Sequence, residues 1–494
     1  MSTDSTYSYT FLDGVPNFSF SESSVTSGLS CTYSSISIEA NREEFCNASL
    51  AIWEHPELGL QEFFASERLT ELLVNNGFRV EKGVAGMPTA FVAEYGEGKP
   101  VIGFSAEFDA LPGLSQKNDA NFHDPVVKGA PGHGCGHNLL SIGGIQAASA
   151  LKRLMDKEGL KGTIRLFGTP AEEICVGKPF MAKAGLFEGL DAVVDWHPGH
   201  TNTSGYRDCP AYFNVKYHFT GKAAHGNAPW RGISALDSAM LMGHAIEIMR
   251  EHVEPGSKES PNTINYAFPD CGNAYPVVVP DRSTIWVVGR FTSATLLKEV
   301  LGKIRKAAEG CAMATGTTVE EEFTAATHNM IPNKVISDDI YENFSIVGAP
   351  AYSVQDQADA KEIQQSMGCE PTGYDGYLEP VRESSQPVTD ASEYSWFAPL
   401  GFFNAALSPS VECSGHNWAV CRLAGSHPGM ETAVTASKVL ALTAYDLMTD
   451  ADLLAAAQAE NLERLGGQVY ESMIPDGVEP DLETNKDLME KFRR

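Results

Sequence analysis

A glycine-rich stretch, Gly132-His-Gly-Cys-Gly-His-Asn138, places a thiol and an imidazole two residues apart. Glycines allow the tight backbone turns that bring two such side chains to one metal ion, so Cys135 and His137 are candidate ligands. The alternative interpretation is a glycine-rich loop that opens a helix at Asn138, in which Cys135 only packs against its neighbours.

Two adjacent carboxylates stand in Thr169-Pro-Ala-Glu-Glu173. Adjacent acids repel each other unless a cation or a division of roles relieves them. If Glu173 binds a metal ion, Glu172 is free to take a proton from water and to pass it to a departing amine. The alternative is an acidic pair exposed to solvent, which is common for Glu-Glu sequences.

Two further imidazoles complete the candidate set. His197 follows the apolar run Ala192-Val-Val, and His416 lies in Gly415-His-Asn-Trp418. A single histidine after a strand is often a hydrogen-bonded core residue rather than a ligand. His427, in Ser-His-Pro-Gly, competes with His416, and spacing alone does not decide between them.

One thiolate, three imidazoles and one carboxylate form a donor set suited to zinc, with manganese or cobalt as alternatives. Asp109, in Ser105-Ala-Glu-Phe-Asp-Ala-Leu-Pro-Gly113, could orient a ligand imidazole. Its alternative role is that of a turn former ahead of Pro112.

The elements around these residues alternate between strand and helix. Apolar, β-rich runs at 89–95, 101–105, 163–168 and 192–196 predict strands, and 139–155 predicts a helix between the second and third. This order predicts an α/β fold with a mainly parallel sheet, in which sites form beyond the carboxyl ends of the strands. Glu107, Asp109, the Glu172-Glu173 pair and His197 all follow such ends.

A change of pattern near residue 207 predicts a small α+β insert of strand, helix, strand, helix and strand. The predicted organisation is an N-terminal extension (1–37), a metal-binding domain (38–206 and 326–450), the insert (207–325) and a C-terminal tail (451–494). We call residues 207–325 the lid.

The acidic composition narrows the range of partners. There are 64 acidic and 36 basic residues, giving a formal charge of -28, which disfavours nucleic acid and anionic membranes. No stretch is apolar for the roughly 20 residues of a membrane-spanning helix. The ten cysteines show no regular spacing and the N-terminus lacks signal-peptide features, so a cytoplasmic location is expected.

Together these motifs resemble the aminoacylase and carboxypeptidase-G superfamily of di-metal amidohydrolases, and within it the branch of the aminobenzoyl-glutamate hydrolases. The similarity extends from about Asn41 to Met448 and includes Trp53-Glu-His-Pro-Glu57, Lys222-Ala-Ala-His-Gly226 and Thr389-Asp-Ala-Ser-Glu-Tyr-Ser-Trp396. The resemblance implies a zinc-exopeptidase-like catalytic domain that holds two divalent metal ions, and a lid that forms a homodimer.

The resemblance also implies a role for each matching residue. His225 corresponds to a lid histidine that stabilises the oxyanion in a partner subunit's site, and Arg290 to an arginine that binds a substrate carboxylate. It favours His416 over His427. The implied metal ligands are Cys135, His137, Glu173, His197 and His416, with Glu172 as general base. One departure is Pro276-Val-Val-Val279, where relatives usually carry an asparagine after the proline.

The expected activity is hydrolysis of N-acyl or N-aroyl amino acids, or of small dipeptides, by a metal-activated water with Glu172 as base. Two alternatives stay open at this point. One is an enzyme of the same fold that condenses an acid with an amine. The other is a metal-dependent binding protein without turnover, against which the spare carboxylate of Glu172 argues.

Overall fold

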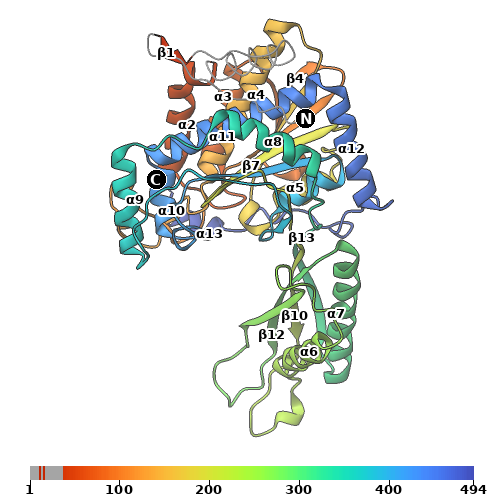
Figure 1. The fold of residues 1–494 in the computed structure, drawn as a ribbon. Coiled ribbons are helices and arrows are strands. Elements are labelled where there is room, and N and C mark those ends of the chain that lie inside the picture. Colours follow the sequence, from red (N-terminus) through yellow and green to blue (C-terminus); the bar gives the residue numbers. More distant parts are fainter. Residues whose placement is uncertain (1–10, 13–14, 17–36, 494) are drawn as a thin grey trace.

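The computed structural model describes residues 11–12, 15–16 and 37–493. The predicted extension 1–37 therefore lies almost entirely outside the described residues. Figure 1 shows a larger body, built around one sheet, from which a smaller sheet and two helices project. No helix in the described part of the chain is both long and apolar enough to cross a membrane.

The larger sheet has eight strands in the order β14-β8-β16-β7-β5-β6-β4-β3. Its central strands β16, β7, β5 and β6 are parallel, and β4 and β3 continue it in antiparallel fashion. The prediction of a mainly parallel sheet is confirmed. The strands are β3 (Arg79–Lys82), β4 (Phe91–Glu97), β5 (Val101–Glu107), β6 (Gly162–Thr169), β7 (Ala192–Gly199), β8 (Asn202–Thr203), β14 (Leu378–Glu379) and β16 (Leu400–Ala406).

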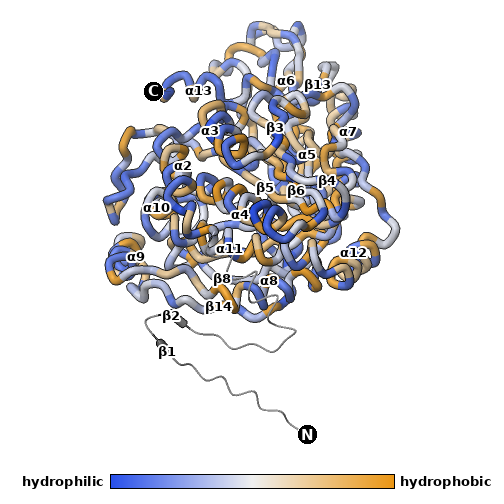
Figure 2. The backbone as a smooth tube through the Cα atoms, turned by 90° about the horizontal axis from the view of Figure 1, so that it is seen from above, coloured by the Kyte–Doolittle hydropathy of each residue, from blue (hydrophilic) through white to orange (hydrophobic). Residues whose placement is uncertain are grey.

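Helices cover both faces of this sheet, because its central strands are apolar on both sides. All seven residues of β5 and all seven of β16 are buried. In Figure 2 the outer helices α2, α3 and α12 show hydrophilic and hydrophobic stretches in alternation, as amphipathic covering helices do. The helices are α2 (Arg42–Glu54), α3 (Phe63–Asn75), α4 (His137–Glu158), α5 (Gly177–Lys183), α8 (Lys334–Val347), α9 (Val354–Ser366), α10 (Trp418–Ala424), α11 (His427–Thr449), α12 (Ala451–Leu465) and α13 (Lys486–Glu490).

The inserted segment forms an antiparallel sheet of four strands in the order β11-β12-β10-β13, packed against two helices. The predicted pattern of three strands is wrong in one respect, because β11 is an additional strand. The elements are β10 (Ala211–Thr220), α6 (Ala235–Arg250), β11 (Thr263–Asp270), β12 (Arg282–Phe291), α7 (Ala294–Thr315) and β13 (Thr318–Thr327). The first and last strands pair with each other, Tyr212 opposite Thr327.

A short two-stranded ribbon lies beside the larger sheet. It pairs β9 (Arg207–Asp208) in parallel with β15 (Ser384–Ser385). Gly205, just before β9, has a φ of 72°, and a Cβ there would lie 1.4 Å from the carbonyl oxygen of Phe402 in β16. Only glycine therefore lets the chain run so close to the larger sheet at this point.

Two half-buried acids, Asp339 of α8 and Asp446 of α11, make stability depend on pH. Burial and the charge of Asp446 raise the pKa of Asp339 to about 8. A carboxyl group that titrates at higher pH in the folded than in the unfolded chain stabilises the fold under acidic conditions, and this contribution is lost as the pH rises from about 4 to about 8.

We therefore expect Asp339→Asn to raise the free energy of unfolding by about 1–2 kcal/mol at pH 8 and by clearly less at pH 5, after allowance for the partial exposure of the side chain. Urea unfolding at both pH values measures the difference. Asp338→Asn is the control, since Asp338 is about half exposed and pairs with Lys334. An equal effect of Asp339→Asn at both pH values would contradict the assignment.

Candidate metal centre

The motif residues come together where the central parallel strands end. Cys135 and His137 lie at the start of α4, the Glu172-Glu173 pair follows β6, and His197 lies near the end of β7. Gly136 adopts a φ of 83°, and a Cβ there would lie 2.9 Å from Cγ of Pro198, so glycine is required between the two ligand candidates.

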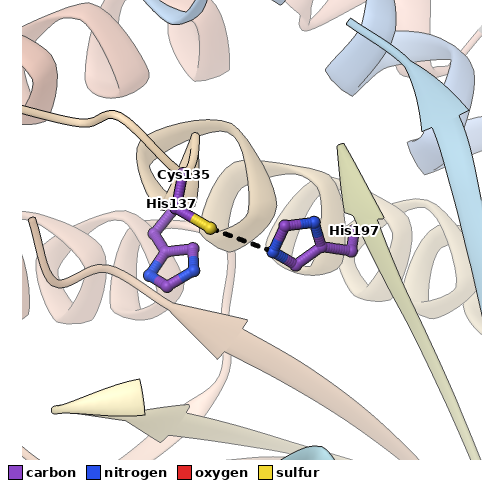
Figure 3. A group of neighbouring side chains, drawn as sticks. All are labelled: Cys135, His137 and His197. Atoms are coloured by element: carbon purple, nitrogen blue, oxygen red, sulfur yellow. Dashed lines mark hydrogen bonds between the residues drawn. The ribbon is translucent and has the colours of Figure 1, made fainter. Parts of the chain in front are cut away.

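The thiol of Cys135 belongs to two groups of side chains that could each hold a metal ion. One is Cys135 with His137 and His197, and the other is Cys135 with Glu173 and His416. Within each group, one possible ligand atom per residue lies within 4.8 Å of the others. Figure 3 shows the first group, in which Cys135 Sγ points to His197 Nε2 at 3.3 Å. A thiolate common to two neighbouring groups is suited to bridging two cations.

His416 and His427 occupy different surroundings. His416 Nε2 lies 3.3 Å from Oε2 of Glu173. His427, at the start of α11, lies 2.8 Å from Asp356 and 3.0 Å from Glu431, and it takes part in neither group. The structure thus brings His416, and not His427, to the other four candidates.

Asp109 connects two of the candidate ligands. Its Oδ1 lies 2.9 Å from His137 Nδ1, and its Oδ2 accepts a hydrogen bond of 3.0 Å from the backbone N–H of Glu173. Asp109 is 1% exposed. These contacts match an orienting carboxylate behind a ligand imidazole, rather than a turn former at the surface.

The backbone around the two glutamates is strained. Ala171 and Cys175, which flank the short helical turn at 172–174, have φ values of 58° and 55°. Glu62 holds this turn, because its Oε1 accepts a 2.8 Å hydrogen bond from the N–H of Ala171. Positive φ at residues other than glycine is uncommon and costs energy, and it concentrates at functional sites.

Three buried polar atoms in this centre have no hydrogen-bond partner: His137 Nε2, Glu107 Oε2 and Glu173 Oε1. The histidine nitrogen lies 3.4 Å from the Glu107 oxygen and 3.9 Å from the Glu173 oxygen. Buried polar atoms are nearly always satisfied, so this convergence fits a cation between them. The residues present therefore fit a metal centre.

The electrostatics of the centre support the same conclusion. Burial, followed by the charge of Glu107, raises the pKa of Glu172 to about 7. Burial opposes protonation of His137, but Cys135 and the hydrogen bond to Asp109 outweigh it and hold its pKa well above the usual value, so the metal-free imidazole carries a proton that a bound cation would replace. Burial and the charge of His137 lower the pKa of His197 to about 4, which keeps that imidazole in its neutral, ligand-competent form. Such crowding of acids calls for positive charge.

A buried lysine contacts one of the acids of the centre. Lys178 Nζ donates to Oε1 of Glu107 at 2.6 Å and also contacts Asp390, and all three side chains are at most 1% exposed. Sequence reasoning placed Glu107 at a strand end but assigned no role to Lys178 or Asp390. The only available signals were a charge within the apolar run that forms α5 and the position of Asp390 in the motif 389–396.

The two lid residues lie in different places. Arg290, from β12, lines a cavity of about 910 Å³ together with Cys135, Glu172, Glu173, His197 and His416. His225 is exposed, pairs through its backbone with Val278, and does not line this cavity. Within one chain, the structure therefore does not bring His225 to the metal centre.

Comparisons with known proteins agree with this site. Residues 103–421 match the family described as Peptidase family M20/M25/M40. The chain is 32% identical to one of the subunits of p-aminobenzoyl-glutamate hydrolase from Escherichia coli, over 90% of this chain and 97% of that protein. It is 28% identical to the Xaa-Arg dipeptidase of Mus musculus, over 86% and 90% of the two chains.

Among solved structures, the fold is similar to that of a dinuclear metal-binding peptidase of the M20 family from Bacillus subtilis. The TM-score is 0.53 at 20% identity, covering 83% of this chain and 99% of that one. At this identity the similarity concerns the fold alone. The family match and the relative with 32% identity carry the assignment: the chain belongs to peptidase family M20/M25/M40 and is a metallo-amidohydrolase.

Proposed function

We propose that this protein hydrolyses the amide bond of N-acyl or N-aroyl amino acids, or of small dipeptides, at a centre of two divalent metal ions. The observation that carries the proposal is the position of Glu172. This buried carboxylate lies beside the two potential ligand groups that share Cys135 and belongs to neither of them, while it forms a third group with Glu107 and His137. The names of two similar proteins, a p-aminobenzoyl-glutamate hydrolase and a hippurate hydrolase, support this substrate class.

We assign Cys135, His137, Glu173, His197 and His416 as ligands. Their donor types favour zinc, with manganese or cobalt as alternatives. When bound, the two cations would lower the pKa of a water molecule and polarise the scissile carbonyl group. Asp109 keeps His137 oriented, and Glu107 adds a buried negative charge behind it.

Glu172 performs the proton transfers in this proposal. It accepts a proton from the attacking water and delivers it to the departing nitrogen, so that an acid and a free amine leave the site. Arg290 faces the same cavity and binds the carboxylate of the amino-acid part, a task for which a guanidinium is suited.

His225 completes the site only in a homodimer formed through the lid. In that arrangement it stabilises the oxyanion in the partner subunit's site. The lid offers an apolar surface for such an interface, with Met240, Leu241 and Ile248 of α6 and Phe268 of the edge strand β11 all exposed. Exposed apolar patches of this kind mark interaction surfaces.

The test combines metal removal with a substrate panel. Protein treated with a chelator should lose turnover, and zinc, manganese or cobalt should restore it at about two ions per chain. The panel comprises N-acetyl and N-benzoyl amino acids and dipeptides, with the released amine measured by mass spectrometry. A protein that carries two metal ions and cleaves no panel member would overturn the proposed hydrolysis, and condensation of the same acids and amines would be assayed next.

A further inference from the structure

A second arginine faces the cavity of the candidate metal centre. Arg207, from β9, lines the same space of about 910 Å³ as Cys135, His197 and Arg290. The two arginines come from different sheets, since β9 pairs with β15 beside the larger sheet and β12 belongs to the lid. One acid outside the metal centre, Glu259, also lines this cavity.

The guanidinium of Arg207 is held by neutral groups. Its Nη1 donates to Oδ1 of Asn404, and its Nη2 donates to Oγ1 of Thr203 at 3.2 Å. The described residues provide no ion pair to Arg207. The negative charge of Glu379 favours the charged form of Arg207 without a direct contact, but that carboxylate is itself paired with Arg382 at 3.0 Å.

Partial burial of a charged guanidinium without an ion-pair partner costs free energy of folding. Arg207 is partly buried, and both of its hydrogen-bond partners are 8% exposed. Burial lowers the pKa of Arg207, because the charged form loses contact with water. Charged groups in such positions are normally paired, so an unpaired cation that faces a cavity indicates an anion supplied by a ligand.

Arg207 is also coupled to the candidate metal centre. Asn404 lies opposite His197 in the β16–β7 pairing, and its Nδ2 donates to the carbonyl oxygen of His197 at 2.9 Å. One asparagine thus holds both the backbone of a candidate ligand and the guanidinium of Arg207. Arg207 and the candidate ligands also line one cavity, so a single substrate molecule placed there would contact both.

We propose that Arg207 binds a second carboxylate of the substrate, distinct from the one bound by Arg290, and that the enzyme prefers dicarboxylic N-acyl amino acids. This inference rests on the proposed function. The formal charge of -28 disfavours anions at long range, so local cations such as Arg207 and Arg290 have to hold them. The same two cations disfavour a substrate with a basic side chain.

The experiment compares each dicarboxylic substrate with its neutral amide. N-benzoyl-glutamate against N-benzoyl-glutamine tests a carboxylate on the amino acid, and N-succinyl-alanine against N-succinamoyl-alanine tests one on the acyl group. For one of these pairs, the unmodified enzyme should show a kcat/KM about 10- to 100-fold higher for the acid, the contribution of a charged hydrogen-bonded pair.

Arg207→Gln should abolish that preference, whereas Arg207→Lys should keep part of it. Glutamine can still donate to Asn404, and metal content checks that the centre is intact. Arg79→Gln is the control, because Arg79 is 81% exposed and does not line the cavity, so its loss should leave the preference unchanged.

The outcomes separate the two proposals. If the unmodified enzyme cleaves both members of each pair equally well, or if Arg207→Gln retains the preference, the assignment of Arg207 is wrong while amide hydrolysis stands. If the metal-loaded enzyme cleaves no member of either pair or of the wider panel, the proposed function itself fails.

Discussion

Glu172→Gln should lower kcat by about 10²- to 10⁴-fold while the protein retains two metal ions per chain, because glutamine preserves the shape of the side chain but cannot accept a proton. Oε2 of Glu172 lies 3.8 Å from His137 Nε2, close to the assigned ligands. Metal content by mass spectrometry and turnover of the best panel substrate give the two readouts. Glu173→Gln is the informative comparison, since loss of a ligand should lower metal content as well.

Mixing the Glu172→Gln protein with the His225→Ala protein tests whether His225 acts in the active site of the neighbouring subunit. If His225 acts in the neighbouring subunit, random exchange of subunits creates intact sites and restores about one quarter of the original activity. If His225 acts within its own chain, each heterodimer contains no intact site and activity does not return. If the Glu172→Gln protein keeps full turnover, Glu172 is not the general base.

Lys178→Met should destabilise the fold by about 3–5 kcal/mol, because it leaves the buried carboxylates of Glu107 and Asp390 without their cation. Methionine fills a similar volume, so the change is mainly one of charge. Urea or guanidinium unfolding of the metal-free protein measures the loss. Lys334→Met is the control, since Lys334 is 53% exposed and its pair with Asp338 should contribute less than about 1 kcal/mol.

Neutralising both acids offers a second check. The triple variant Glu107→Gln, Lys178→Met, Asp390→Asn removes all three charges and should recover a substantial part of the lost stability. Lys178→Met should also weaken metal binding, because Lys178 positions the carboxylate of Glu107 against His137. A Lys178→Met protein as stable as the parent would show that these charges are compensated in another way.

The sequence was sufficient to predict the central sheet because its strands are continuous apolar runs followed by polar residues. The strand β11 was missed for a physical reason. Residues 263–270 are largely exposed or half exposed and include Pro269, so they carry little of the alternation that marks a strand. Hydrogen bonds from β12, which no local pattern reveals, define this strand.

The candidate ligands could be predicted because their residue types are rare and their spacing is specific. Lys178, Glu62 and Arg207 could not, since a single charge in a sequence is normally interpreted as solvent-exposed. Their burial depends on segments distant in the chain, such as Asp390 for Lys178 and Asn404 for Arg207. The choice between His416 and His427 likewise required the position of Glu173 relative to both.

The lid leaves and re-enters the larger body at one place, because Tyr212 near its beginning lies opposite Thr327, which follows its end in the same strand β13. When the two ends of an inserted segment are neighbours, the length of the insertion does not affect the strand order of the sheet that it interrupts. The lid is therefore an insertion that is connected to the larger body at a single place. A change in the length or the surface of the lid would therefore leave the strand order of the larger sheet and the candidate metal ligands in place.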